Sequence, residues 1–158
     1  MSSIRIARAD PAEPEARHCL DAYAAELDRR FGEGGFDPAR SLPATDDELR
    51  PPAGFLLVAT MDGNPVGCTA LKLHGEEPAE VKRMWVDPTV RGVGLGRRLL
   101  VAVEEEARAE GVTVLHLETN ETLTEAIALY RSAGYVEVPP FNDEPYAHHW
   151  FEKRLPPD

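Results

Sequence analysis

The stretch "VRGVGLGRR", from Val90 to Arg98, holds three glycines at alternate positions with arginines on both sides. Alternate glycines give up side-chain packing and add entropy to the unfolded chain, so they indicate backbone that must stay open. The stretch follows a predicted strand and begins a predicted helix. Unpaired amides at a helix N-terminus, together with the helix dipole, favour an anion. We therefore expect a phosphate on this loop, with Arg91 or Arg97 adding a charge-assisted hydrogen bond.

The distribution of charge supports an anion site in this part of the chain. The formal net charge is −11, which argues against a nucleic-acid backbone as the main partner. Between Lys82 and Arg98, however, five side chains are basic and only Asp87 is acidic. A basic segment within an acidic chain is expected where an anionic group binds.

Two familiar phosphate loops fit this stretch poorly. A Walker A loop needs GxxxxGK[ST], and neither Lys-Ser nor Lys-Thr follows the glycines. A dinucleotide fingerprint needs GxGxxG, and Arg97 occupies the place of its third glycine. The stretch also lies in the middle of the chain, after a predicted hairpin. A nucleotide-binding protein of the Rossmann type is therefore disfavoured.

Periodicity and turn residues divide the rest of the chain into strands and helices. Gly94 to Glu110 is predicted as a helix with one apolar stripe of Leu95, Leu99, Val103 and Ala107, ended by Gly111. A second helix, within 122–134, has a Thr122-to-Glu125 capping box and stops at Gly134. The other predicted elements are a helix over 10–31, a loop over 32–53 with one short helical turn, and strands within 3–9, 54–75 (two, joined by "MDGNP"), 79–88, 112–120, 135–138 and 146–155.

This order indicates an α/β protein built on a mixed sheet. The early strands meet as antiparallel hairpins, and the later strands are joined through helices, from which we expect parallel pairing. We predict one domain over 1–158, with a central sheet of six to seven strands and about four helices on its two faces. The loop over 32–53 could act as a flap over a substrate.

Composition places the chain among soluble globular proteins, with 42% hydrophobic and 28% charged residues. No apolar run approaches the roughly 20 residues of a membrane helix, so we expect no membrane partner. Cys19 and Cys68 do not form a CxxC motif and are expected to be buried small hydrophobic residues. A cytoplasmic location is the expectation that fits best.

The spacing Arg91-x-x-Gly94-x-Gly96 resembles the pyrophosphate loop of the GCN5-related N-acetyltransferase (GNAT) superfamily, whose signature is Arg/Gln-x-x-Gly-x-Gly/Ala. The stretch "AEVKRMWVDPTVRGVGLGRRLL" resembles the family's fourth strand, loop and third helix. "VLHLETNETLTEAIALYRSAGY" resembles its fifth strand and fourth helix, and contains the phrase from Leu129 to Tyr135. Residues from about 54 to 155 match in element order, whereas the first 50 match only in outline.

The resemblance implies that acetyl-CoA is the co-substrate, and no metal is expected. The pyrophosphate would bind the amides of the loop, and the pantetheine arm would enter between two diverging strands and pair with the first of them. The Met84 amide would polarise the thioester carbonyl, an oxyanion-hole role. The implied cofactor-binding residues are Met84, Trp85, Val86, Arg91, Gly92, Val93, Gly94, Leu95, Gly96, Arg97, Asn120 and Tyr130.

Acetyl transfer to an alkylamine requires a base, because only about one molecule in a thousand is neutral at pH 7. Glu80 is the leading candidate: strand alternation would put it on the same face as Met84 and Val86, and a glutamate at this place serves as base in several family members. A surface glutamate paired with a lysine is the plainer interpretation. Glu118 and His116 are rival bases, and His148 and His149 are interpreted as plain strand residues.

Tyr130 is the candidate acid, because its place in "LYRSAGY" matches the family tyrosine that hydrogen-bonds the CoA sulfur. Its alternative is a core tyrosine with an unrelated hydroxyl partner. Asn120 matches a family asparagine that contacts the pantetheine arm, and it could equally be a helix N-cap.

The leading hypothesis is an enzyme that transfers acetyl from acetyl-CoA to a primary amine of a small molecule or peptide by direct attack. A catalytically silent acyl-CoA-binding sensor or interaction module is the alternative. The acceptor site is predicted in "PFNDEPYAHHWF", with Asn142, Asp143, Glu144 and Tyr146 as its contacts. A homodimer is one option for the assembly, since dimers are common in this superfamily.

Overall fold

The computed structural model describes residues 3–31, 34–37, 45–75 and 77–156. The predicted elements are present in the predicted order, and the loop over 32–53 contains one short 3₁₀ turn, η2 (Asp46–Leu49). The remaining elements are β1 (Ile4–Ala9), α1 (Pro14–Arg30), β2 (Gly54–Met61), β3 (Asn64–His74), β4 (Glu77–Val86), the 3₁₀ turn η3 (Pro88–Val90), α2 (Leu95–Ala109), β5 (Val114–Thr119), α3 (Thr124–Ser132), β6 (Val136–Val138) and β7 (His149–Arg154).

The strands of the described residues form one seven-stranded sheet, in the order β1-β2-β3-β4-β5-β7-β6. Neighbouring strands are antiparallel except for β4 and β5, which are parallel. The mixed sheet is confirmed, and three α-helices, rather than about four, lie in the described part of the chain. Parallel pairing is also expected from the sequence between β5 and β6, which α3 connects. This expectation is wrong, because β7 lies between β5 and β6 and is antiparallel to both.

The β2–β3 hairpin turns where its sequence indicates. Met61 pairs with Asn64, which leaves a two-residue loop of Asp62 and Gly63. Both loop residues have positive φ, 53° and 84°, as a type I′ turn requires. The Asp-Gly signal therefore fixes the register between the two strands that lead to the site.

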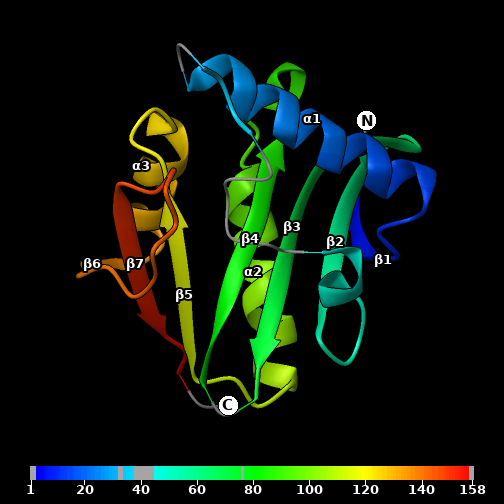
Figure 1. The fold of residues 1–158 in the computed structure, drawn as a ribbon. Coiled ribbons are helices and arrows are strands. Elements are labelled where there is room, and N and C mark those ends of the chain that lie inside the picture. Colours follow the sequence, from blue (N-terminus) through cyan, green and yellow to red (C-terminus); the bar gives the residue numbers. More distant parts are fainter. Residues whose placement is uncertain (1–2, 32–33, 38–44, 76, 157–158) are drawn as a thin grey trace.

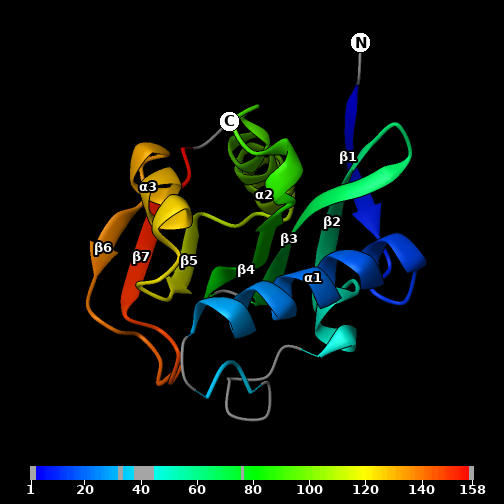
Figure 2. The same cartoon turned by 90° about the horizontal axis from the view of Figure 1, so that it is seen from above.

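Helices cover both faces of the sheet (Figures 1 and 2). Helix α1 lies on one face, where its buried Cys19 and Leu20 pack with Trp85 of β4. Helices α2 and α3 lie on the other face, where the main core contains Leu100 and Val103 of α2 and Tyr130 of α3. The predicted stripe of α2 is confirmed, since Leu95, Leu99, Val103 and Ala107 are all buried.

The parallel pair β4 and β5 separates soon after it forms. Its ladder contains only two partners, Ala79 with Leu115 and Glu80 with His116. Beyond these residues the two strands diverge toward the end of the sheet that α1 crosses (Figure 1). Among the residues that the structure describes, no strand therefore pairs with residues 81–86 on the β5 side, and this gap positions the site.

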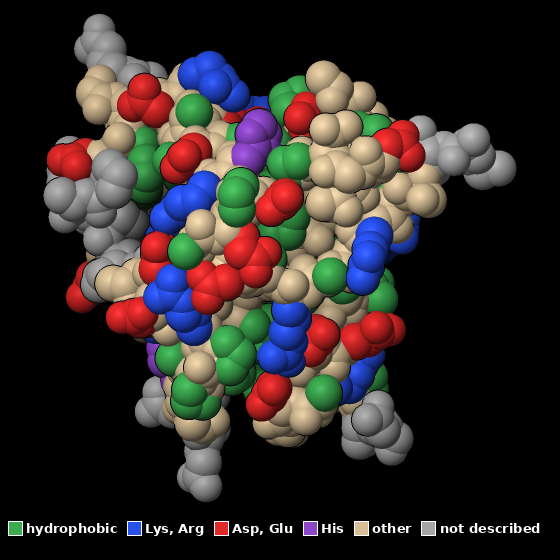
Figure 3. Space-filling model, turned by 90° about the vertical axis from the view of Figure 1, so that its right-hand side faces the viewer, with side chains coloured by type: hydrophobic (Ala, Val, Ile, Leu, Met, Phe, Trp, Pro, Cys, Tyr) green, Lys and Arg blue, Asp and Glu red, His purple; other side chains and the backbone are tan. Residues whose placement is uncertain are grey.

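Charges on the side of the molecule next to β1 are interspersed rather than segregated (Figure 3). Ion pairs there include Arg8 with Glu106 at 2.6 Å and Arg50 with Asp10 at 2.9 Å. Such exposed pairs contribute little to stability each. Within the described ranges, no helix has the length and apolar character needed to cross a membrane.

Candidate active site

The glycine loop between β4 and α2 presents a row of backbone N–H groups. The amides of residues 92–97 have no hydrogen-bond acceptor within the described part of the chain, and the first helical bond is that of Arg98 to the Gly94 carbonyl, 3.1 Å. Gly92 and Gly94 have φ values of 92° and 78°, and a Cβ atom on either would meet open space. An anion can therefore approach these amides at the positive end of a fifteen-residue helix.

Gly96 has a different role from the other two glycines. A Cβ atom there would come within 2.9 Å of Leu129 Cδ2, on α3. Gly96 therefore allows α2 to pack against α3, and it also lines the cleft that begins at this loop.

A large cleft of about 430 Å³ runs from this loop into the gap beyond β4. Most of the predicted cofactor-binding residues on β4 and on the loop line this cleft. Val93 is the exception on the loop, and 61% of its surface is exposed. The cleft is lined by Met84, Trp85 and Val86 of β4, by Val90–Gly92 and Gly94–Arg97 of the loop and α2, by Tyr23, Glu26, Leu27 and Arg30 of α1, and by Leu123, Glu125, Ala126 and Leu129 at α3.

Ion pairs connect the walls of the large cleft. Arg91 pairs with Glu26 of α1, and Arg30 of the same helix pairs with Glu125 of α3 at 2.9 Å and lies 3.8 Å from Glu26. The hydrogen bonds from Arg30 lower the pKa of the Glu125 carboxyl. Arg97 donates to the Ser132 hydroxyl, 2.5 Å. Both loop arginines therefore face protein partners across the cleft.

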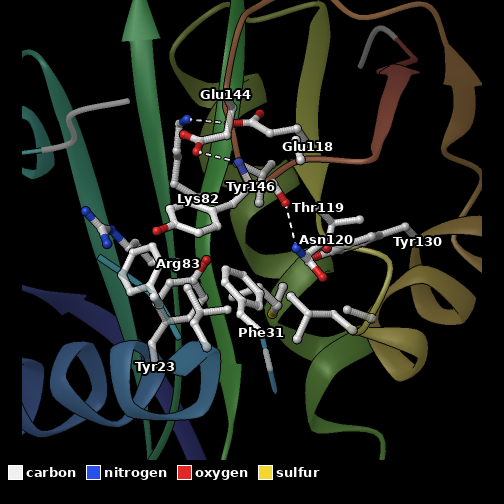
Figure 4. A pocket seen from close by; sticks show the side chains of 17 residues that line it. Tyr23, Phe31, Lys82, Arg83, Glu118, Thr119, Asn120, Tyr130, Glu144 and Tyr146 are labelled. Atoms are coloured by element: carbon white, nitrogen blue, oxygen red, sulfur yellow. Dashed lines mark hydrogen bonds and ion pairs between the residues drawn. The ribbon is translucent and has the colours of Figure 1, made fainter. Parts of the chain in front are cut away.

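A small pocket of about 100 Å³ continues the large cleft between β4 and β5 (Figure 4). The two share Tyr23, Leu27, Met84, Leu123 and Ala126, so they adjoin, and the two cavities together are called the passage. The remaining lining comes from β4, β5, α3 and the segments on either side. It consists of Phe31, Phe36, Val81, Lys82, Arg83, Glu118, Thr119, Asn120, Tyr130, Glu144, Tyr146 and Ala147.

A β-bulge at Arg83 decides which side chains of β4 enter this pocket. Ala70 pairs with Lys82 and Cys68 with Trp85, so β4 has one residue more than β3 over this span. Arg83 takes the extra place with φ of 60°. The bulge shifts the alternation: Met84 packs with Val81 on the α2 side of the sheet, whereas Trp85 packs on the α1 side.

The expectation that Glu80 shares a face with Met84 and Val86 is wrong for this reason. Glu80 accepts a hydrogen bond from His74 Nε2, 2.7 Å, and its Oε1 is 3.9 Å from Lys82 Nζ. Glu80 lines neither the small pocket nor the large cleft. Lys82, which does line the small pocket, lies between Glu80 and that pocket.

Glu118 on β5 is the carboxylate that lines the small pocket and has an unused oxygen. Its side chain is 8% exposed, and Oε1 accepts from Lys82 Nζ at 2.9 Å. Its Oε2 is buried and has no hydrogen-bond partner within the described ranges. A buried carboxylate oxygen left in this state can accept a proton from a group that enters the pocket.

Tyr130 of α3 lines the same pocket (Figure 4). Its side chain is 5% exposed, and no hydrogen bond of its hydroxyl lies within the described part of the chain. Burial raises the pKa of its phenol, and Tyr23 and Glu118 raise that pKa further. The hydroxyl therefore stays protonated, as a proton donor must.

His116, the other rival base, lies outside both cavities. It pairs with Glu152 at 3.0 Å and stacks on Phe141 with a centroid distance of 4.1 Å. His148 accepts from the Glu121 amide, 3.1 Å, and His149 pairs with Glu137 at 2.7 Å.

Asn120 directly follows β5 and lines the small pocket, and both the nitrogen and the oxygen of its side-chain amide form hydrogen bonds. Its Nδ2 donates to the Tyr146 carbonyl, 2.7 Å, and its Oδ1 accepts from the Thr122 amide and hydroxyl. The predicted capping box from Thr122 to Glu125 is wrong, because α3 has Leu123 at its N-cap and no side-chain cap. Asn120 thus joins α3 to the segment before β7 and is not the helix N-cap.

Three aromatic side chains from distant segments form one side of the pocket. This aromatic wall consists of Phe31, Phe36 and Tyr146, whose ring centroids lie 5.0–5.8 Å apart. Tyr146 also accepts from the Asp37 amide, 2.9 Å. The predicted flap contributes through Phe36, while residues 32–33 and 38–44 of that loop lie outside the described residues.

The predicted acceptor segment contributes two of its four named residues to the lining, Glu144 and Tyr146. Asn142 instead accepts from Trp150 Nε1, 2.9 Å, and Asp143 is exposed. From the sequence, Tyr23 and Phe31 are expected only as members of the predicted helix over 10–31, and Phe36 only as part of the loop over 32–53. No local sequence pattern predicts that these three side chains line one pocket, because only the tertiary fold brings them close to Tyr146.

Comparison with known proteins identifies relatives of this chain. The family profile described as "Acetyltransferase (GNAT) family" matches residues 19–135. An IAA acetyltransferase of Azospirillum brasilense is 41% identical over 143 residues, which cover 89% of this chain and 90% of that protein. A GNAT-family acetyltransferase structure from Staphylococcus aureus Mu50 has a TM-score of 0.81 at 17% identity and covers 98% of this chain and 100% of that one. A GNAT-family acetyltransferase structure from Elizabethkingia anophelis, with acetyl-CoA bound, has a TM-score of 0.64 at 18% identity and covers 96% and 98%.

Proposed function

Because the chain belongs to the acetyltransferase (GNAT) family and is an acetyl-CoA-dependent N-acetyltransferase, we propose that its small pocket receives a primary amine, which takes the acetyl group by direct attack. The observation that carries the proposal is the pair of adjoining cavities, one lined by the glycine loop and the other by the Glu118 carboxylate. A phosphate-binding end and a proton-accepting end, joined through the gap between β4 and β5, suit this transfer. A silent acyl-CoA sensor is not favoured.

The residues around the large cleft fit acetyl-CoA. The unpaired amides of residues 92–97 and the guanidinium groups of Arg91 and Arg97 suit a pyrophosphate. The open β5-facing edge of residues 84–86 suits an extended amide-bearing arm, and we assign the Met84 amide to the thioester carbonyl. Asn120 would contact that arm through the amide hydrogen that Tyr146 leaves free. Acetyl-CoA, when bound, supplies the acetyl group as a thioester.

Glu118 is the base in this proposal, and Glu80 is not. An acceptor amine arrives mostly as an ammonium ion and must lose a proton before its lone pair can attack. Glu118 lines the pocket with Oε2 unengaged, whereas Glu80 lies beyond Lys82 and is already bonded to His74. Glu118 Oε2 therefore takes the proton that frees the lone pair and passes it to solvent, and it takes the second nitrogen proton as the C–N bond forms.

Tyr130 is the acid in this proposal. When the C–S bond breaks, the sulfur leaves as a thiolate, and the Tyr130 hydroxyl donates a proton to it. The hydroxyl has no competing hydrogen bond among the described residues, so it is available to the sulfur. Each turnover removes two protons from the nitrogen: one is released to solvent, and the other balances the proton that Tyr130 gives to the sulfur, so that Glu118 returns to its carboxylate form and Tyr130 to its phenol form.

The aromatic wall and Glu144 shape the acceptor preference. We propose a primary amine of a small molecule or peptide whose neighbouring group is apolar or aromatic, since Phe31, Phe36 and Tyr146 form that end of the pocket. The buried thiols of Cys19 and Cys68 fit a reducing compartment, and we propose the cytoplasm. We also propose a homodimer, which light scattering on the purified chain tests.

A thiol-release assay with acetyl-CoA tests the function against a panel of tyramine, 2-phenylethylamine, spermidine, lysine and short peptides with free N-termini. Turnover with at least one amine, fastest where an aromatic group neighbours the amine, is expected. Acetyl-CoA, but not NAD or ATP, should raise the melting temperature, because a ligand that binds only the folded state stabilises it. No shift at millimolar acetyl-CoA would contradict the proposal.

A further inference from the structure

We infer that Lys82 is a positioning residue for the reaction: its ammonium group holds one oxygen of Glu118 and keeps the buried carboxylate charged, so that the other oxygen is available to the amine. This inference rests on the proposed role of Glu118 as base. Lys82 does not touch the reacting atoms in this scheme and acts only through Glu118.

The pair stands at the point where β4 and β5 part. The last backbone partners of the parallel ladder are Glu80 and His116, and Lys82 and Glu118 each lie two residues further along. Two residues along a strand return to the same face, so both side chains project from the α1 face of the sheet at the opening of the gap. The 2.9 Å contact between Lys82 Nζ and Glu118 Oε1 spans the strands where the ladder has ended.

The ion pair between Lys82 and Glu118 is strengthened by burial. The Lys82 and Glu118 side chains are 13% and 8% exposed, so water screens the pair only weakly. A carboxylate buried without a counter-charge tends to take up a proton, and a protonated carboxyl group cannot act as base. Lys82 therefore gives the buried Glu118 carboxylate its counter-charge, at 2.9 Å from Oε1.

The other groups around Glu118 do not replace Lys82. Glu80 of β4 and Glu144, before β7, add negative charge, which disfavours a second carboxylate nearby. Burial raises the pKa of Tyr23 of α1 and of Tyr130 of α3, so both phenols stay neutral. Arg83 lines the pocket on β4 with its guanidinium 5.9 Å from the Tyr23 ring. Among the described residues, Lys82 is the only cation with an ion pair to Glu118.

Glu80 gains a role from this arrangement. Its Oε1 lies 3.9 Å from Lys82 Nζ, and its Oε2 is held by His74 at 2.7 Å. The ammonium group of Lys82 is thus flanked by two carboxylates, one outside the pocket and one inside it. Glu80 restrains Lys82 from behind.

The pH dependence of kcat/KM tests the inference, measured with the fastest amine of the panel above. In Lys82→Met, the acid limb of the profile should move to higher pH by about 1–3 units, since a carboxylate without its cation keeps its proton to higher pH. Lys82→Arg should return the acid limb to within about half a pH unit of its position in the wild-type protein. The amine's own ionisation is common to all variants, so the difference reports the enzyme.

Lys72→Met is the matched control, because Lys72 of β3 pairs with Glu48 at 2.7 Å outside both cavities. It should leave the limb in place. If Lys82→Met does not fold, Lys82→Gln serves instead, with folding checked by circular dichroism. A folded, neutral variant at position 82 whose acid limb coincides with that of the wild type would overturn the inference.

Glu118→Gln separates this inference from the proposal on which it rests. If Glu118→Gln keeps wild-type turnover, the assignment of the base fails, and the role of Lys82 falls with it. If Glu118→Gln loses turnover while Lys82→Met keeps a wild-type acid limb, only the role of Lys82 fails. We expect Glu118→Gln to lose at least about 100-fold, and Lys82→Met to add little in that background.

Discussion

Gly96 lies so close to Leu129 that a Cβ atom on the glycine would stand 2.9 Å from Leu129 Cδ2. The three alternate glycines of the loop therefore have two separate roles. Gly92 and Gly94 have positive φ and face open space, so they shape the anion site. Gly96 has no such backbone requirement and permits the close approach of α2 and α3.

Gly94→Glu should weaken acetyl-CoA binding at least tenfold, because it brings a negative charge to amides that receive a phosphate. The substitution also strains the backbone, at a cost of about 1 kcal/mol for a side chain in the left-handed region. Gly111→Glu is the matched control: its φ is 81°, its Cβ position is equally open, and it lies past the far end of α2. Isothermal titration calorimetry should show lost affinity in Gly94→Glu alone; equal losses in both variants would assign the effect to strain.

Tyr130→Phe should lower kcat by about 100-fold or more while acetyl-CoA affinity and melting temperature stay near wild type. The ring remains in its core, and the hydroxyl has no hydrogen bond to lose among the described residues. Tyr135→Phe is the converse control, because its hydroxyl donates to buried Glu104 at 2.9 Å outside the pocket. It should lower stability by about 1–3 kcal/mol and leave kcat unchanged. Unaltered turnover in Tyr130→Phe would remove Tyr130 from the mechanism.

The alkaline side of the kcat profile should stay flat up to about pH 10. Burial disfavours the phenolate and so raises the pKa of Tyr130 above its ordinary value near 10. A group with a raised pKa keeps its proton over the range below it, and donation to the sulfur is lost only as pH rises through that raised value. A decline of kcat that begins near pH 8, and that Tyr130→Phe abolishes, would contradict this expectation.

Much of the fold could be predicted because its signals are local. The Asp62-Gly63 turn, the apolar stripe of α2 and the glycines that follow the helices each depend on a few neighbouring residues. The insertion of β7 between β5 and β6 could not be predicted in this way. It depends on pairings such as Val114 with Arg154, between residues far apart in the chain.

In the site, too, local motifs could be predicted from the sequence, whereas features that depend on distant residues could not. The phosphate loop and Tyr130 carry motifs, and the structure places them along one passage. The bulge at Arg83 carries no sequence signal, because its positive φ falls on an arginine where glycine or asparagine would be expected. Strict alternation therefore put Glu80 on the face of Met84 and Val86, which the bulge separates from it. Glu80 also lies outside both cavities and is bonded to His74, whereas Glu118 lines the small pocket.

Glu26→Gln should tighten acetyl-CoA binding about two- to tenfold. The Glu26 carboxylate lines the large cleft, pairs with Arg91 and lies 3.8 Å from Arg30. A neutral side chain there frees Arg91 for a phosphate and removes a repulsion from it. Glu15→Gln, on the exposed side of the same helix, is the control. Calorimetry at low salt should show the gain and high salt should reduce it; weaker binding would mean that Glu26 holds Arg91 in its binding position.

Phe36→Ala should raise the KM of an aromatic amine about three- to tenfold and leave the KM of acetyl-CoA unchanged. Phe36 lies 5.1 Å from Tyr146 and 5.8 Å from Phe31 by ring centroids, and it lines the small pocket but not the large cleft. Loss of one aromatic contact corresponds to about 0.5–1.5 kcal/mol. Phe141→Ala removes a ring that stacks on His116 outside the pocket and is the control. The effect should be larger for 2-phenylethylamine than for spermidine, since only the former places a ring against the aromatic wall. Equal changes for both amines would mean that Phe36 shapes the pocket without contacting the acceptor.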